Sequence, residues 1–336
     1  MKRWLAWITL CAVVTGAFAW RIYADLRTPF FGASQKEVFV KIPKGASAPA
    51  IARALVGAGV LRRELPFLVY LRWKGQTRDL QAGEYRFATP ATPGEVAARL
   101  VRGDVFYVSV TIPEGLTAEE TISLIARHGL GATEDLRRAL SRVDWIRDLD
   151  DRAHSLEGYL FPETYRFPRD TDSEAILRAM VEQFRTRFRK LLNGRPVPGS
   201  RAVRDIVILA SLVEKETGSE NERGLVASVL TNRLARGIPL ACDPTIIYAM
   251  KLAGRYDGNL RRADLAMDSP YNTYIHAGLP PGPIANPGSG ALAAALDPTP
   301  SPYLYYVSRN DGTHVFSEDF RSHLQAVERY QKTRRR

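Results

Sequence analysis

The chain has 336 residues, of which 45% are hydrophobic and 25% charged, and this balance excludes a largely disordered protein. Its formal net charge of +11 favours an anionic partner, such as nucleic acid, a lipid surface or an acidic polymer, and indicates little about the fold. With only two cysteines, Cys11 and Cys242, a disulfide framework is also excluded.

The N-terminal segment predicts a membrane anchor. The uncharged stretch from Trp4 to Trp20 is long enough to cross a bilayer, and it carries tryptophan at both ends, where membrane helices meet the headgroups. Lys2 and Arg3 precede it, so the positive-inside tendency places the N-terminus in the cytoplasm and the rest of the chain on the periplasmic or extracellular side. The alternative is a cleaved signal peptide, since residues 17–19 have the small-x-small form of a cleavage site. The paired tryptophans favour an uncleaved, single-pass anchor in the plasma (inner) membrane.

Two internal repeats follow a short tether. A shared Ile-Pro-x-Gly aligns two segments, VKIPKGASAPAIARALVGAGVL from Val40 and VTIPEGLTAEETISLIARHGL from Val110. A shared Tyr-Arg-Phe aligns a second pair, EYRFATPATPGEVAARLV from Glu84 and TYRFPRDTDSEAILRAMV from Thr164. Each unit predicts a half-buried strand, a turn and a short helix, and such repetition usually means repeated supersecondary structure. The pattern resembles the LysM-type carbohydrate-binding module, while a generic α+β scaffold that binds nothing is equally compatible.

An apolar helix is predicted to end in two glutamates. Residues 205–216 lack glycine and proline and are apolar almost all round, which is typical of a buried helix. Glu214 shares a face with Val207, so we expect a partly desolvated carboxyl group whose pKa is raised, as a general acid requires. Glu216 lies about 200 degrees further round the helix, so the two carboxyl groups do not form a pair on one face. The alternative is that both are solvated near Lys215, and the helix alone does not decide between these interpretations.

A 20-residue loop from Ser269 to Gly288 is crowded with tyrosine, proline, glycine and asparagine, and it predicts a wall of a binding site. Four neighbouring side chains offer stacking faces, an amide and hydroxyl groups suited to N-acetylated sugars: Tyr271, Asn272, Thr273 and Tyr274. The five histidines show no ligand-like spacing, so no metal site is predicted.

Seven motifs in order give a resemblance: EGYLFPETY, ASLVEKET, ASVLTNRL, DPTIIYAM, RADL, SPYNTY and GLPPGPIANPG. Together they resemble the YceG-like family of endolytic murein lytic transglycosylases, membrane-anchored enzymes that cut peptidoglycan glycan strands. The resemblance implies that Glu214, the first glutamate of VEKET, is the single catalytic acid and base. It also implies that five further residues line the cleft: Asn232, Asp243, Tyr271, Asn272 and Thr273. No cofactor is expected, and peptidoglycan synthases are the expected partners, in a role that ends strand elongation.

A lytic enzyme needs one carboxyl group, because the muramoyl C6 hydroxyl supplies the nucleophile. The bond between N-acetylmuramic acid and N-acetylglucosamine breaks, the C6 oxygen bonds to C1, and the muramic acid is left with a 1,6-anhydro end. Two alternatives stay open. A hydrolytic muramidase would recruit a second carboxylate from Glu216, Glu163 or Asp243. A non-catalytic scaffold would bind the cell wall through its LysM-like units. A nucleic-acid partner is not expected, because the basic residues are scattered and the anchor would export them.

The predicted fold is α+β, with a membrane helix, LysM-like α/β units and a mainly helical catalytic domain with long Pro/Gly-rich site loops. The predicted domains are a transmembrane anchor at 1–24, a tether at 25–36, a LysM-like region at 37–150 and a catalytic domain at 151–336.

Overall fold

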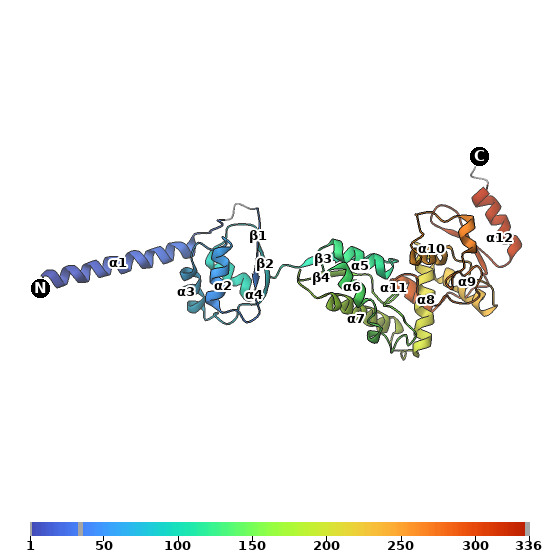
Figure 1. The fold of residues 1–336 in the computed structure, drawn as a ribbon, viewed down its shortest axis with the longest axis horizontal. Coiled ribbons are helices and arrows are strands. Elements are labelled where there is room, and N and C mark those ends of the chain that lie inside the picture. The colour runs from blue at the N-terminus through green and yellow to red at the C-terminus, as the bar shows by residue number, and fades with distance from the viewer. Residues whose placement is uncertain (1, 33–35, 333–336) are drawn as a thin grey trace. The chain divides into compact units, whose positions relative to one another are not determined.

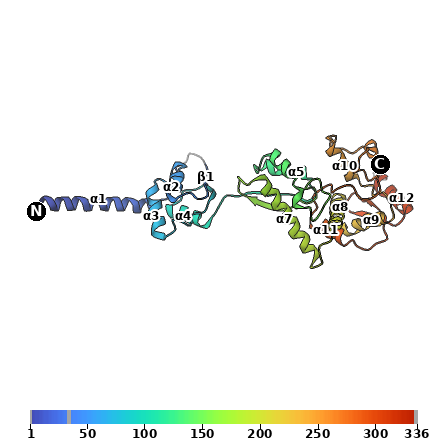
Figure 2. The same cartoon turned by 60° about the horizontal axis from the view of Figure 1, so that its bottom comes forward.

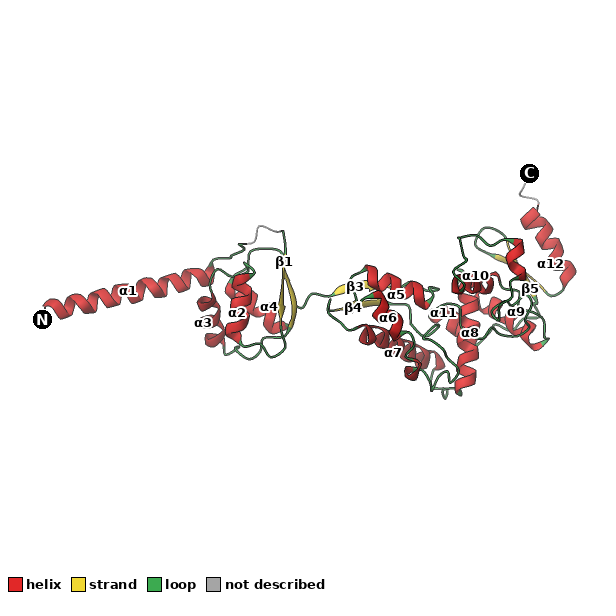
Figure 3. Ribbon diagram, in the orientation of Figure 1, coloured by secondary structure: helices red, strands yellow, loops and turns green. Residues whose placement is uncertain are grey.

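The computed structural model describes residues 2–32 and 36–332 (Figure 1). Contacts divide the chain into two compact units. Unit 1 runs to Val108 and includes Arg166–Arg169, and unit 2 contains Ser109–Tyr165 and the chain from Asp170 onward. Helices and strands are both present, which confirms a mixed α and β composition (Figure 3). Residues 110–150, predicted as part of the LysM-like region, thus belong to unit 2, and the predicted domain ranges stay a prediction.

Unit 1 begins with helix α1 (Lys2–Arg27). Its segment Trp7–Arg27 is long and apolar enough to cross a membrane, by length and composition. Trp7 and Trp20 are 67% and 71% exposed, so unit 1 itself does not bury this apolar stretch. Residues 25–27, predicted as the start of the tether, are the last turn of α1, and residues 33–35 of that tether lie outside the described residues. The helix is compatible with the predicted anchor.

The globular part of unit 1 is a pair of antiparallel strands covered by helices. Val40 pairs with Tyr85, and the buried faces of the two strands continue into the helices as one hydrophobic core that includes Phe67 and Leu100. The alternation of buried and exposed residues along the first strand explains its half-buried position. The elements are β1 (Val38–Ile42), α2 (Ala48–Gly57), α3 (Glu64–Lys74), β2 (Gly83–Phe87) and α4 (Pro93–Arg102).

Unit 2 is mainly helical, and the buried helix α8 (Ser200–Glu216) packs against α9, α10 and α11 (Figures 1 and 2). Val207 and Val213 are fully buried, as the apolar pattern predicts. Within unit 2, β5 pairs with β6, while β3 pairs with β4 and each of these two strands has residues in both units. The other elements are β3 (Val108–Thr111), α5 (Ala118–Arg127), α6 (Thr133–Ala139), η1 (Val143–Trp145), β4 (Thr164–Phe167), α7 (Ser173–Leu192), α9 (Arg223–Ala235), α10 (Asp243–Leu252), η2 (Arg262–Ala266), α11 (Ser289–Leu296), β5 (Tyr305–Ser308), β6 (His314–Ser317), α12 (Phe320–Val327) and η3 (Glu328–Lys332).

Candidate active site

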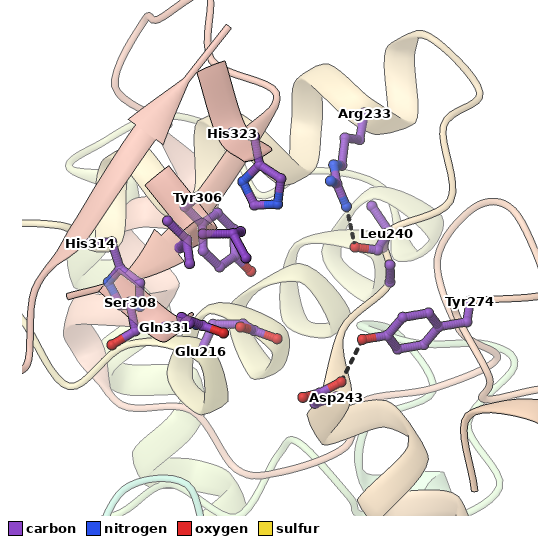
Figure 4. Close-up of a pocket in the computed structure, with 13 residues that line it drawn as sticks. Glu216, Arg233, Leu240, Asp243, Tyr274, Tyr306, Ser308, His314, His323 and Gln331 are labelled. Carbon is purple, nitrogen blue, oxygen red and sulfur yellow. Dashed lines mark hydrogen bonds between the residues drawn. The ribbon is translucent and has the colours of Figure 1, made fainter. Parts of the chain in front are cut away.

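The last turn of α8 borders a cavity of about 470 Å³ in unit 2 (Figure 4). This volume falls within the range of ordinary small-molecule sites. Figure 4 shows Glu216 at the base, with Tyr306 and His314 on one side and Asp243 and Tyr274 on the other. The wall is completed by Arg233, Leu240, Ala241, Val307, Ser308, His323, Val327 and Gln331.

Glu216 brings a desolvated carboxyl group to this cavity. Its Oε1 atom is buried and accepts no hydrogen bond from the described residues. Burial raises the pKa of Glu216, and the negative charge of Asp243 raises it further. Hydrogen bonds with the Tyr306 hydroxyl and the Cys242 thiol, together with His314, lower this pKa but do not cancel the effect of burial. Glu216 therefore holds its proton to higher pH than an ordinary glutamate.

The loop that contains Thr273 fixes the opposite wall of the cavity. The Thr273 carbonyl accepts a hydrogen bond from the Ala241 amide at 2.9 Å, and its hydroxyl accepts one from the Cys242 amide at 3.0 Å. Ala241 has φ +53°, a left-handed conformation that costs free energy for a residue with a side chain. These contacts hold the turn that presents Asp243, whose carboxylate accepts a hydrogen bond from the Tyr274 hydroxyl.

Two of the predicted cleft residues hold main-chain segments in place. The side-chain amide of Asn232 donates to the carbonyls of Ser301 and Tyr303 at 2.8 and 2.9 Å. The side-chain amide of Asn272 donates to two carbonyls of segment 265–267 at 3.0 and 2.8 Å, and its oxygen accepts from the Tyr274 amide at 2.9 Å. Both amides are therefore engaged in shaping loops, and neither lines the cavity.

Tyr271 lies at a second, smaller cavity of about 40 Å³. Its ring centroid is 4.9 Å from that of Tyr248, and burial raises the pKa of its hydroxyl. The carboxyl group of Glu157 borders the same cavity and accepts a hydrogen bond from Tyr248 at 3.3 Å. Of the residues predicted to bind substrate, only Asp243 and Tyr274 share the cavity of Glu216.

Glu214 is buried among different partners. Its side chain is 6% exposed, its Oε2 accepts a hydrogen bond from the Gly288 amide at 2.9 Å, and its Oε1 lies 3.7 Å from the Arg223 guanidinium. Burial raises the pKa of Glu214 and nearby Glu114 raises it further, in agreement with the expected direction. Glu214 does not line the 470 Å³ cavity. Its contacts tie α8 to the start of α11, and its predicted catalytic role stays a prediction.

Comparison with known proteins gives the same family as the seven sequence motifs. The sequence profile of the YceG-like family matches residues 40–329. The chain belongs to the YceG-like family. This YceG-like chain is 32% identical over 334 residues to a protein of Bacillus subtilis (strain 168) named endolytic murein transglycosylase. The alignment covers 95% of the chain and 91% of the relative.

Two further relatives extend the comparison. A protein of Streptococcus pneumoniae (strain ATCC BAA-255 / R6) with the same name is 30% identical over 325 residues, which is 87% of the YceG-like chain but 58% of the relative. The chain thus spans little more than half of the pneumococcal protein. A crystal structure of a YceG-like protein from Listeria monocytogenes superposes with a TM-score of 0.58 at 29% identity, covering 87% of this chain and 99% of that one.

The C-terminal wall of the cavity was not predicted from the sequence of this YceG-like protein. Tyr306 and His314 come from the β5–β6 hairpin, and His314 is further fixed by Glu222, whose Oε2 lies 2.7 Å from its Nδ1. The sequence indicates only that His314 lies in a strand or loop, because nothing local links it to α8. Among the described residues no cluster of three His, Cys, Asp or Glu side chains is arranged to hold a metal ion.

Proposed function

We propose that this protein is a lytic transglycosylase that cuts peptidoglycan glycan strands internally, between N-acetylmuramic acid and N-acetylglucosamine. Family membership and the names of the Bacillus and Streptococcus relatives support the class of reaction. The buried carboxyl group of Glu216 in a cavity large enough for sugar rings is the observation that carries the assignment of the site.

Glu216, in place of Glu214, is the proton donor in this proposal. Both carboxyl groups have a raised pKa, so protonation alone does not separate them. A general acid must also reach the oxygen that it protonates. Glu216 borders the cavity and has an oxygen that no described residue contacts by a hydrogen bond. Glu214 is committed to the Gly288 amide and faces Arg223, which suits a residue that holds helices together.

The proposed reaction uses Glu216 twice. Its carboxyl proton passes to the bridging glycosidic oxygen as the bond between that oxygen and muramoyl C1 breaks, and N-acetylglucosamine leaves as the alcohol. The carboxylate then takes the proton of the muramoyl C6 hydroxyl, whose oxygen forms a bond to C1 and closes the 1,6-anhydro ring. No water is consumed, and Glu216 returns to its protonated form. The nucleophile belongs to the substrate, which supplies the proximity advantage.

A hydrolytic muramidase is the second candidate, because Asp243 lines the same cavity as Glu216. A hydrolase needs a second carboxylate to activate water or to attack the sugar. The Asp243 carboxylate is bonded to the Tyr274 hydroxyl, and this contact supports a role in holding the sugar. Glu163 does not line the cavity and is instead ion-paired with Arg187.

Matched substitutions Glu216→Gln and Glu214→Gln test the assignment on purified glycan strands. Glutamine keeps the volume of glutamate but is no acid, so Glu216→Gln is expected to lose about 100-fold or more of the cleavage rate. Glu214→Gln is expected to retain cleavage, with reduced thermal stability. If Glu214→Gln is inactive and Glu216→Gln is active, the assignment to Glu216 is wrong and Glu214 is the catalytic residue. Cleavage at background by the wild type and both variants would favour the non-catalytic scaffold.

The location of the reaction is part of the same proposal. With α1 as a single-pass anchor and the N-terminus in the cytoplasm, unit 2 would meet strands as they are made at the membrane, beside peptidoglycan synthases. The element order β1–α2–α3–β2 in unit 1 supports the LysM-like interpretation and a role in holding glycan. Co-purification of the full chain with a synthase from detergent-solubilised membranes would test the partnership, and its absence would count against it.

A further inference from the structure

Helix α3 in unit 1 carries an apolar stripe on its exposed face. Leu65, Val69 and Trp73 are 44%, 38% and 75% exposed, and their spacing of four residues places them on one side of the helix. The opposite side is committed to the core, where Phe67 and Leu71 are completely buried. Single exposed apolar residues are common, but three in a row along one helix indicate a contact surface.

Basic residues border this stripe. Arg62 and Arg63 precede α3, and Arg72 and Lys74 lie in its last turn, against one acidic residue in the helix, Glu64. Exposed tryptophan is enriched where proteins meet the headgroup region of a membrane, and nearby lysine and arginine are attracted to anionic headgroups.

The position of α3 relative to α1 places α3 near the headgroup level of a membrane that α1 would cross. Trp20 is 71% exposed on α1, and tryptophan favours the headgroup level of a membrane. Five residues later, roughly 7.5 Å along the helix axis, Asp25 lies 4.0 Å from Arg63 at the start of α3. Figures 1 and 2 both show α3 on the side of the globular part of unit 1 from which α1 projects. A bilayer crossed by α1 would therefore lie close to the start of α3.

We propose that α3 lies on the outer surface of the membrane, with Leu65, Val69 and Trp73 in the interface and Arg72 and Lys74 against anionic lipid headgroups. The ligand is the phospholipid surface itself. The inference rests on α1 crossing the bilayer and is independent of the cleavage reaction. It gives unit 1 a second membrane contact, which fixes how this unit is oriented on the bilayer.

Lipid quenching of site-specific labels in the full chain tests this contact. The chain is reconstituted into protein-free vesicles that contain anionic phosphatidylglycerol, and a polarity-sensitive fluorophore is attached at Val69→Cys in a Cys11→Ser background, where the remaining Cys242 is buried. The matched control is Arg86→Cys, an exposed position on β2. Figure 1 shows this strand on the opposite side of the globular part of unit 1 from α3. We expect a blue shift and quenching by nitroxide lipids at position 69 and neither at position 86. Nitroxides near the headgroup should quench more than nitroxides near the terminal methyl group.

A label on the native Cys11 distinguishes loss of the α3 contact from failure of α1 to insert into the membrane. Labelled alone in the wild type, Cys11 reports whether α1 is inserted. Quenching at Cys11 without quenching at position 69 would overturn the α3 contact while leaving the anchor intact. An unquenched Cys11 would overturn both. Arg72→Glu with Lys74→Glu should reduce quenching at position 69 in anionic vesicles, and an unchanged signal would contradict the role of the headgroup charges.

Discussion

Two glutamates separated by one lysine have different surroundings, because their side chains leave α8 in different directions. Glu214 contacts the Gly288 amide and Arg223, so it holds the helix end against its neighbours. Glu216 borders a cavity, and the same burial that raises its pKa leaves its Oε1 without a hydrogen bond from the described residues. A buried oxygen without a partner costs free energy. A substrate hydroxyl would remove that cost by donating to the carboxylate, and the bridging oxygen would remove it by accepting a hydrogen bond from the protonated carboxyl group.

Replacing Tyr306 with Phe tests how the cavity sets the proton affinity of Glu216. The hydrogen bond with Tyr306 lowers the pKa of Glu216, so its removal raises this pKa above its already elevated value. The protonated form that a general acid needs then persists to higher pH. We expect the alkaline limb of the pH profile of kcat/KM to move to higher pH in Tyr306→Phe. The control is Tyr303→Phe, in which we expect no such shift, because Tyr303 does not line the cavity. A limb that stays in place or moves to lower pH would contradict this account.

At the scale of elements, the segment around Gly158, which is far from α8 in the sequence, packs against this helix. The Asn286 side-chain oxygen accepts hydrogen bonds from the Gly158 and Leu160 amides at 2.9 and 3.0 Å, and it thereby joins the loop before α11 to segment 156–160. Gly158 has φ +87° and packs directly against Pro283 and Val207 of α8. The EGYLFPETY and GLPPGPIANPG motifs thus meet beside the middle of α8.

Gly158→Ala should destabilise unit 2. The new Cβ would lie 2.5 Å from Pro283 Cγ and 2.9 Å from Val207 Cγ1, and it would also strain the left-handed backbone. We expect a loss of about 3 kcal/mol in the free energy of unfolding, measured by urea denaturation. Gly218→Ala, with no atom within 4 Å of the added Cβ, should change it by less than about 0.5 kcal/mol. Equal effects from the two substitutions would contradict this packing.

At the scale of the whole molecule, patterns in short segments of the sequence predicted those features that are determined by neighbouring residues. The buried helix ending in Glu216, the apolar N-terminal helix and the family resemblance belong to this group. The family resemblance implied Glu214 as the catalytic acid. The proposal of Glu216 rests on a cavity whose wall comes from β5, β6 and the C-terminal helices, which lie far from α8 in the sequence. Asn272 was predicted to line the cleft from its chemistry and from the family resemblance, and the structure shows its amide engaged with main-chain carbonyls.

In the proposed reaction, one carboxyl group cleaves the glycan strand without consuming water. Digestion of purified glycan strands in oxygen-18-labelled water, followed by mass spectrometry of the new ends, tests it most directly. We expect muramoyl ends that are lighter than reducing ends by one water and contain no oxygen-18, because the attacking oxygen comes from the C6 hydroxyl. Reducing muramic acid ends that each contain one oxygen-18 atom would contradict it and would assign Asp243 and Glu216 to a hydrolase.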